Sequence, residues 1–278
     1  MADVTVTTAA GALATRVSDR TLPAFEAALV LRNLVTVEMQ PVGKGDVIKF
    51  PPIGALAATA RSAGADVTFL ANTDTAVTMT INKEDYVAIN LEGIVKLLAS
   101  PSYLAGLALK MGLGLAVKIQ SRLVALNTSL TEAVGTSTTK ITLAYSHLVD
   151  AKEDVDGNNV PEEGRFWLFN SVGVSKVLNL TQIIKSNYAG VAELALGGGL
   201  AKPFARILGY PAFQTSATPA NKIILAGQDA FGLGLSSELI TMLNPNDVRK
   251  QGDLMSVAAI YGTKSLRPGS GSVIHYNT

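Results

Sequence analysis

The spacing of apolar residues predicts one long helix near the middle of the chain. Between residues 102 and 126, bulky apolar side chains recur at intervals of three or four, at Leu104, Leu107, Met111, Leu115, Ile119, Leu123 and Leu126. This spacing is typical of one buried face of an α-helix, and Pro101 suits its first turn. The opposite side carries Lys110, Gly114, Lys118, Ser121 and Arg122. Glycines inside this segment lower its helix propensity, so we expect close packing to hold the helix.

Apolar and polar residues alternate before this helix and predict a long hairpin. Val47, Ile48 and Phe50 give a short first strand, and residues 77–81 and 86–91 give the return. Residues 53–75 lie between them, and their first half consists of small side chains without a bulky core set. A segment of this length without its own core is either disordered or folded against something else. We place the tip of the hairpin in this alanine-rich part.

The rest of the chain predicts an extended arm, then a mixed α/β region, then strands. Residues 1–20 show little periodicity and are expected to form the arm. Helices are expected at 22–35, 143–152 and 171–184, the last capped by Asn170 or Ser171. A polar turn is expected at 154–159. Strands are expected at 165–169, 206–213 (as strand, turn and strand), 222–226, 231–235, 254–261 and 272–276.

Composition argues against a solitary soluble domain. Of the 278 residues, 48% are hydrophobic and only 16% are charged, against about 25% charged in an average soluble domain. A disordered chain is excluded, because it needs low hydrophobicity and high net charge. The surplus apolar surface must lie in a membrane or against other subunits.

A membrane location is not expected. The most apolar stretch, residues 97–109, is interrupted by Ser100, Pro101 and Ser102, so it falls short of a spanning helix. The first residues lack the basic region and apolar core of a signal peptide. We therefore expect synthesis in the cytoplasm, no membrane partner and a large interface between subunits.

The sequence offers no enzyme constellation. The chain has no cysteine, a formal net charge of +1 and only two histidines, His147 and His275. An EF-hand loop opening at Asp154 would need glycine and glutamate where Asn159 and Arg165 stand. The glycines at 197–199 are not followed by the Gly-Lys-Ser/Thr of a phosphate loop. We expect no catalytic residue, no metal site and no cofactor, and adjacent acids such as Glu84–Asp85 are interpreted as solvated loop charges.

The order of these parts resembles the major capsid protein of tailed bacteriophages, with the Hong Kong 97-type fold. Residues 45–51 are similar to the entry to the family's extended hairpin loop, residues 77–91 to the return strand and residues 102–126 to the spine helix. Three later segments are also similar to family segments: 160–170, 206–216, and 261–264 with Pro268. The resemblance covers nearly the whole chain.

The resemblance implies an α+β fold with a fixed division of the chain. The implied parts are an N-terminal arm and short helix (1–45), an extended hairpin loop (46–91), the spine helix of a peripheral domain (92–127), an axial domain (128–250) and closing strands (251–278). It also implies a structural protein of the virion. Copies would form hexamers and pentamers that close into an icosahedral head shell and contact packaged DNA non-specifically. Because the chain lacks a charged helical scaffolding region, a separate scaffolding protein is expected, together with a portal.

Two sets of residues are candidates for contacts in such a shell. The hairpin tip would lie over an adjacent subunit, with contacts from Ile53, Leu56, Arg61, Asp66 and Phe69. On the long helix, Lys110, Lys118 and Arg122 would face packaged DNA or a partner's carboxylates, or simply solvent. Two alternatives stay open: an encapsulin-type shell that holds cargo protein, and a mixed α/β enzyme.

Overall fold

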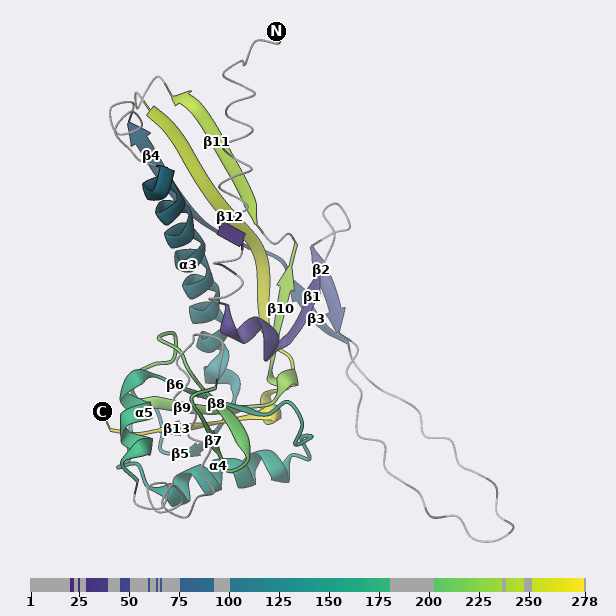
Figure 1. Ribbon diagram of the computed structural model, residues 1–278. Coiled ribbons are helices and arrows are strands. Elements are labelled where there is room, and N and C mark those ends of the chain that lie inside the picture. The colour runs from purple at the N-terminus through teal and green to yellow at the C-terminus, as the bar shows by residue number, and fades with distance from the viewer. Residues whose placement is uncertain are drawn as a thin grey trace.

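The fold is known from a computed structural model, drawn in Figure 1. It describes residues 29–39, 46–50, 76–92, 101–180, 203–236, 239–247 and 252–277, and the single residues 21, 22, 25, 60, 64 and 66. The predicted arm (1–20) and most of the predicted hairpin tip lie outside the described residues.

The long helix α3 (Pro101–Ala125) lies along an elongated five-stranded sheet (Figure 1). Strand β12 is the centre of this sheet. One edge of β12 pairs with β4, while the other edge pairs first with β11 and then with β10, all antiparallel. Strand β1 adds to β10 in parallel. The strands are β1 (Thr36–Met39), β4 (Lys83–Glu92), β10 (Phe231–Leu235), β11 (Ile240–Asp247) and β12 (Gly252–Ser265).

The core of this region forms between α3 and one face of the sheet. Along β12, alternate residues from Met255 to Tyr261 are buried, whereas the residues between them are half-buried. This period of two means that the sheet is buried on one face. Helix α3 packs there with the apolar positions that the sequence indicated, among them Met111, Leu115 and Ile119. The predicted long helix is confirmed.

A six-stranded sheet forms the second part of the molecule. Its strand order is β5-β13-β9-β6-β8-β7, and helices α4 and α5 belong to the core on one of its faces. In β6, Trp167 and Phe169 enter that core, whereas Phe166 and Leu168 enter the core shared with α3. The elements are β5 (Thr131–Val134), α4 (Tyr145–Gly157), β6 (Phe166–Phe169), α5 (Ser171–Leu178), β7 (Ala205–Ile207), β8 (Tyr210–Gln214), β9 (Lys222–Ala226) and β13 (Gly271–His275).

A separate two-stranded sheet joins β2 (Val47–Phe50) to β3 (Val77–Thr80) in antiparallel register. These strands match the predicted start and return of the hairpin. The chain then continues from β3 into β4, which belongs to the five-stranded sheet. Short 3-10 turns complete the described elements: η1 (Val30–Asn33), η2 (Leu126–Ser129), η3 (Gln228–Ala230) and η4 (Pro268–Ser270).

Several local predictions are confirmed. Strands β6, β9 and β10 lie where their apolar runs placed them. Asn170 caps α5 by accepting a hydrogen bond from the backbone N–H of Gly173 at 2.7 Å. The strand–turn–strand at 206–213 turns at Leu208 (φ 52°) and Gly209 (φ 87°), and two positive φ values are what a two-residue hairpin turn requires.

Other predictions are wrong at their boundaries. The polar turn expected at 154–159 is helical as far as Gly157. The reason is that Val155 continues the buried face of α4 begun by Leu148 and Ala151, so burial outweighs the polar residues around it. The helix expected at 22–35 contains the 3-10 turn η1 near its end. Strands β1, β5 and β11 were not expected.

Candidate assembly surface

The root of the hairpin is fixed to the five-stranded sheet by a small apolar cluster. Ile48, Met79 and Ile81 are buried together, and Ile260 of β12 packs against them. On the polar side, the Nζ of Lys264 donates to the backbone carbonyl of Thr78 at 2.7 Å. Strands β2 and β3 therefore cannot swing freely, and the hairpin starts from a defined place on the sheet.

Glycines in the sheet allow this close approach. A methyl group at Gly262 would overlap the backbone carbonyl oxygen of Thr80, and one at Gly234 would meet the side chains of Met79 and Ile48. A glycine inside a strand weakens it but admits a neighbouring segment at close range. The two glycines therefore leave the space in which the hairpin root packs against the sheet.

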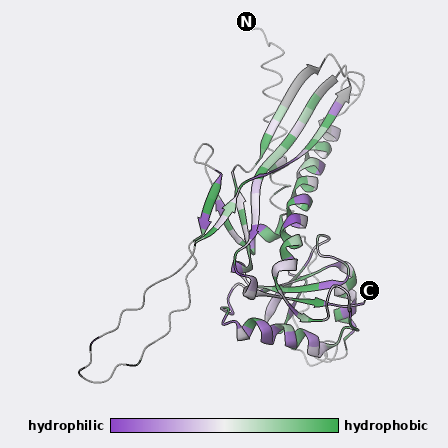
Figure 2. Ribbon diagram, turned by 180° about the vertical axis from the view of Figure 1, so that it is seen from behind, coloured by the Kyte–Doolittle hydropathy of each residue, from purple (hydrophilic) through white to green (hydrophobic). Residues whose placement is uncertain are grey.

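The sheet face opposite α3 is half-buried along its centre and exposed at its two outer strands. We call it the outer face; it consists of Tyr86, Ala88, Ile240, Met242, Ser256 and Ala258, which neighbour one another across β4, β12 and β11. Tyr86 is 70% exposed and Met242 is 61% exposed. Figure 2 shows hydrophobic stretches on α3 and on the strands beside it. Large exposed apolar side chains that gather on one face indicate an interaction site.

Helix α3 is bound to the sheet by a polar cluster. The guanidinium of Arg122 donates to both oxygens of Asp85, at 2.8 and 2.9 Å, and the hydroxyl of Tyr261 donates to the same carboxylate. The hydrogen bond from Arg122 is the main reason that the pKa of Asp85 lies below its usual value. Burial, and then the bond to Asp85, raise the pKa of Tyr261. Interpreting Asp85 as a solvated loop charge was wrong, because its partners are brought to it by the fold.

The three basic residues that the sequence grouped on α3 have different surroundings. Arg122 points its charge toward Asp85 of the same chain. Lys110 and Lys118 are exposed, and neither forms a hydrogen bond or ion pair with another residue in the part of the chain that the structure describes. The lysines therefore keep outward-facing charges. Contact with DNA or with a partner's carboxylates stays a prediction for all three residues.

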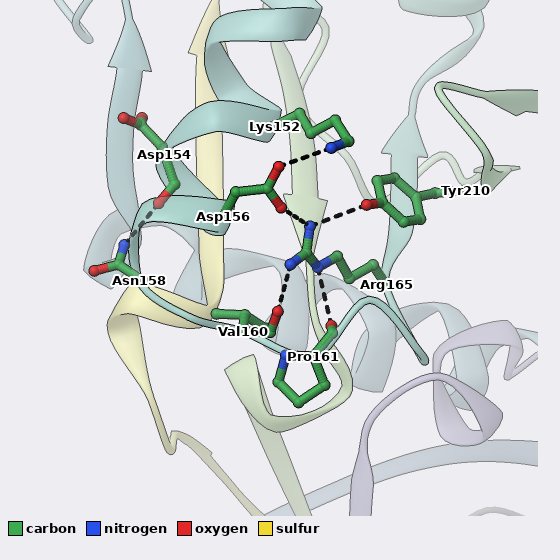
Figure 3. Close-up of polar contacts among 8 residues, drawn as sticks. All are labelled: Lys152, Asp154, Asp156, Asn158, Val160, Pro161, Arg165 and Tyr210. Atoms are coloured by element: carbon green, nitrogen blue, oxygen red, sulfur yellow. Dashed lines mark hydrogen bonds and ion pairs between the residues drawn. The ribbon is translucent and has the colours of Figure 1, made fainter. Parts of the chain in front are cut away.

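A buried arginine holds the end of α4 against the six-stranded sheet (Figure 3). Only 2% of the Arg165 side chain is exposed. It donates to the carbonyl of Pro161 at 2.9 Å, to the carbonyl of Val160 and to the hydroxyl of Tyr210 at 3.0 Å. It also pairs with Asp156. One side chain thus joins helix α4, the loop that follows it and strand β8.

The groups around Arg165 make contacts that hold the fold together. Asp156 also accepts from Lys152 at 2.7 Å, and the bonds from Lys152 and then Arg165 lower its pKa. A shallow hollow of about 420 Å³ beside the cluster is lined by residues that include Glu162, Arg206 and Pro211. Among the described residues, no group of three or more His, Asp or Glu side chains is placed to hold a metal ion. The cluster is explained by its structural contacts.

Polar contacts join α3 and the turn after it to the six-stranded sheet. Thr215 donates to Gln120 at 3.1 Å, and the Nζ of Lys222 donates to Asn127 at 2.6 Å. Nearby, the Nε2 of buried His275 lies 3.1 Å from a carboxylate oxygen of Glu132. The Nδ1 of His275 is buried without a hydrogen-bond partner among the described residues.

The stability of the chain should fall in mild acid because of His275. Burial, followed by the positive charge of Lys222, lowers the pKa of His275, and Glu132 only partly opposes this effect. The unfolded chain then binds the proton first, so the free energy of unfolding should be at its full value above pH 6.5 and fall as the pH drops below it. Denaturant unfolding at several pH values measures this slope. His275→Asn should flatten it, whereas His147→Asn retains His275 and should keep it; an unchanged slope in His275→Asn would assign the effect to other groups.

The predicted contacts of the hairpin tip are mostly beyond the described residues. Ile53, Leu56, Arg61 and Phe69 all lie outside them, whereas Asp66 is described and exposed. Their role between subunits therefore stays a prediction. In the described part of the chain, no helix combines the length and the apolarity that crossing a bilayer requires.

The fold is similar to those of solved capsid structures over about nine-tenths of the chain. The capsid structure of cyanophage P-SCSP1u aligns with a TM-score of 0.69 at 17% identity, covering 91% of this chain and 89% of that one. A structure from Mycobacterium phage Che8 aligns with a TM-score of 0.66 at 17% identity, covering 88% and 90%. A virus-like particle from Pyrococcus furiosus aligns with a TM-score of 0.60 at 13% identity, covering 92% and 96%. The sequence matches no protein-family model and no curated protein. The predicted α+β capsid fold is confirmed.

Proposed function

We propose that this chain is a major capsid protein, which forms hexamers and pentamers that close into an icosahedral head shell around phage DNA. The observation that carries the proposal is the likeness of nearly the whole chain, rather than of one motif, to subunits of phage capsids. A shell subunit works through its contacts with neighbours, so it needs no reactive group.

The exposed surfaces of the chain support this function. The outer face presents Tyr86 and Met242 to solvent on a sheet that α3 covers on its other side. The low charge content of 16% fits a subunit whose surface is largely covered by others. When contacts join different patches on neighbouring copies, the copies form a closed ring if the rotation between them closes.

Assembly of the shell would involve partners beyond the capsid subunit itself. A separate scaffolding protein would guide assembly and a portal would occupy one vertex, while packaged DNA would be contacted without base recognition. Synthesis in the host cytoplasm would precede assembly of the virion. These expectations follow from the resemblance of the sequence to the family and await their own tests.

A second candidate is an encapsulin-type shell that encloses cargo protein. The observation that keeps this candidate is the likeness to a structure described as a virus-like particle from Pyrococcus furiosus rather than as a phage, at a TM-score of 0.60. Both candidates share the fold and the assembly, and they differ in what the shell contains.

Substitutions on the outer face test whether it takes part in assembly. Tyr86→Lys combined with Met242→Lys should raise the concentration needed for assembly by about tenfold or more, because two desolvated apolar contacts are replaced by charges. Light scattering against protein concentration measures this, and circular dichroism checks that the monomer stays folded.

The matched control is Val149→Lys, which adds a charge at a side chain on α4 that is 40% exposed. It should assemble close to wild type. If the double variant assembles at the wild-type concentration, the outer face is not covered in the shell.

A further inference from the structure

The solvent side of α3 carries two parallel rows of side chains. Leu109, Leu113 and Val117 follow one another at intervals of four and are between 38% and 45% exposed. We call them the apolar row. Lys110 and Lys118 form the basic row beside it, with Gly114 between them. Residues four apart lie on one ridge of a helix, so the two rows run side by side along α3.

The charge of this surface has one sign. Helix α3 contains no aspartate or glutamate over its full length. Arg122 pairs with Asp85 of β4, and the charge of Lys118 also helps to lower the pKa of Asp85. Lys110 and Lys118 remain the exposed charges of α3 that form no ion pair with another described residue. The same surface on a second copy would place lysine against lysine, so pairing of α3 with α3 is disfavoured. A fitting partner must bring apolar side chains and negative charge together.

We propose that the apolar and basic rows are the docking surface for an acidic amphipathic helix of a separate protein. The inference rests on the proposed function, in which the partner would be the scaffolding protein, and it assigns that protein a place on α3. The apolar side chains of the partner helix would pack against the apolar row, and its flanking carboxylates would bind Lys110 and Lys118. Such ridge-into-groove packing is the common way for two helices to meet.

A protein partner fits this surface better than nucleic acid does. Surfaces that bind the phosphate backbone are rich in positive charge and polar groups, whereas three of the five side chains in the two rows are apolar. Two lysines on one helix would also give only weak binding to DNA, because non-specific affinity grows with the number of neutralised phosphates. The apolar row is the feature that decides between the two.

The test uses a synthetic amphipathic peptide and the full chain. The peptide has leucines on one face flanked by glutamates, and a second peptide has lysine at each glutamate position. Fluorescence anisotropy should show binding of the acidic peptide and no binding of the basic one. Lys110→Glu combined with Lys118→Glu should weaken the acidic peptide about tenfold or more, because two attractions become repulsions. Val117→Ser should weaken it by several-fold.

Matched controls separate these effects from general changes of the surface. Lys140→Glu reverses an exposed lysine in a loop, and Val149→Ser removes an exposed valine on α4; both should bind the peptide like wild type. The proposal is overturned if the acidic peptide fails to bind, or if it binds the double lysine variant as well as wild type. It is also overturned if the double lysine variant loses binding to duplex DNA but keeps its binding to the peptide. That result would make α3 a nucleic-acid surface.

The assembly of the same variants keeps this inference distinct from the proposed function. If the wild-type chain forms shells but peptide binding is unchanged in the lysine variant, only the docking surface is refuted. If the wild-type chain binds the peptide through the lysines but forms no shells under any condition, only the capsid function is refuted.

Discussion

Deletion of residues 54–66 should leave a folded monomer that no longer assembles. The root of the hairpin is held by Ile48, Met79 and Ile81 against β12, and the deletion removes none of these contacts. The deleted segment consists mostly of small residues and has no bulky core set, so its loss should cost the monomer little stability. Circular dichroism and thermal unfolding measure the fold, and light scattering measures assembly.

A second variant separates the length of the hairpin from its side chains. Replacing residues 54–66 with glycine and serine at the same length should also prevent assembly, because the contacts with a neighbour are lost while the span is kept. Unfolding of either variant as a monomer would show that the segment belongs to the core of its own subunit. Normal shells from both variants would show that the tip takes no part in assembly.

Arg165→Ala should lower the free energy of unfolding by about 3 kcal/mol, as expected when one partner of a buried charge cluster is removed. The substitution leaves the carbonyls of Val160 and Pro161 and the hydroxyl of Tyr210 without their donor. It also releases the end of α4 from β8. Urea unfolding at a concentration below assembly measures the loss.

The control for this variant is Arg267→Ala. Arg267 and its partner Asp229 are about half exposed and 3.9 Å apart. Arg267 also donates to the carbonyl of Asn158 at 2.9 Å, but in an exposed position, so the change should cost about 1 kcal/mol or less. Arg165→Lys should recover part of the stability, because an ammonium group can satisfy some of the acceptors. Equal losses in Arg165→Ala and Arg267→Ala would mean that the buried cluster does not hold α4 in place.

The elements that the sequence predicted well are those whose own side chains decide their structure. The buried face of α3 repeats over the full helix, and the apolar run of β6 ends at the helix cap Asn170. The signal for each element lies in adjacent residues, although β6 itself pairs with the distant strands β8 and β9. The end of α4 was misplaced because the burial of Val155, which only the fold reveals, outweighs the polar residues around it.

The strands that were missed depend on distant partners. Strand β1 exists because it pairs in parallel with β10, and β5 exists because it pairs in parallel with β13. Strand β11 includes Pro245 and follows the edge of β12, where its ladder is interrupted by an irregularity. Four-residue segments such as β1 and β5 are too short for a periodic pattern to show.

The candidate surface was predictable only in part. Helical spacing placed Lys110 and Lys118 on the side of α3 away from its core, and both are exposed. It could not show that Arg122 meets Asp85, because that pairing depends on how β4 packs against α3. It also could not identify the outer face. Alternation along β4 and β12 divides each strand into two sides, but which side α3 covers is a property of the whole fold.

Negative-stain electron microscopy of the purified full chain, together with size-exclusion light scattering, tests the capsid function most directly. We expect closed shells, or five- and sixfold rings, at high concentration or with crowding agents. The contents of the particles would then separate a phage head from a cargo shell. A chain that stays monomeric with crowding agents and with an added scaffold would contradict the capsid function and favour a mixed α/β enzyme.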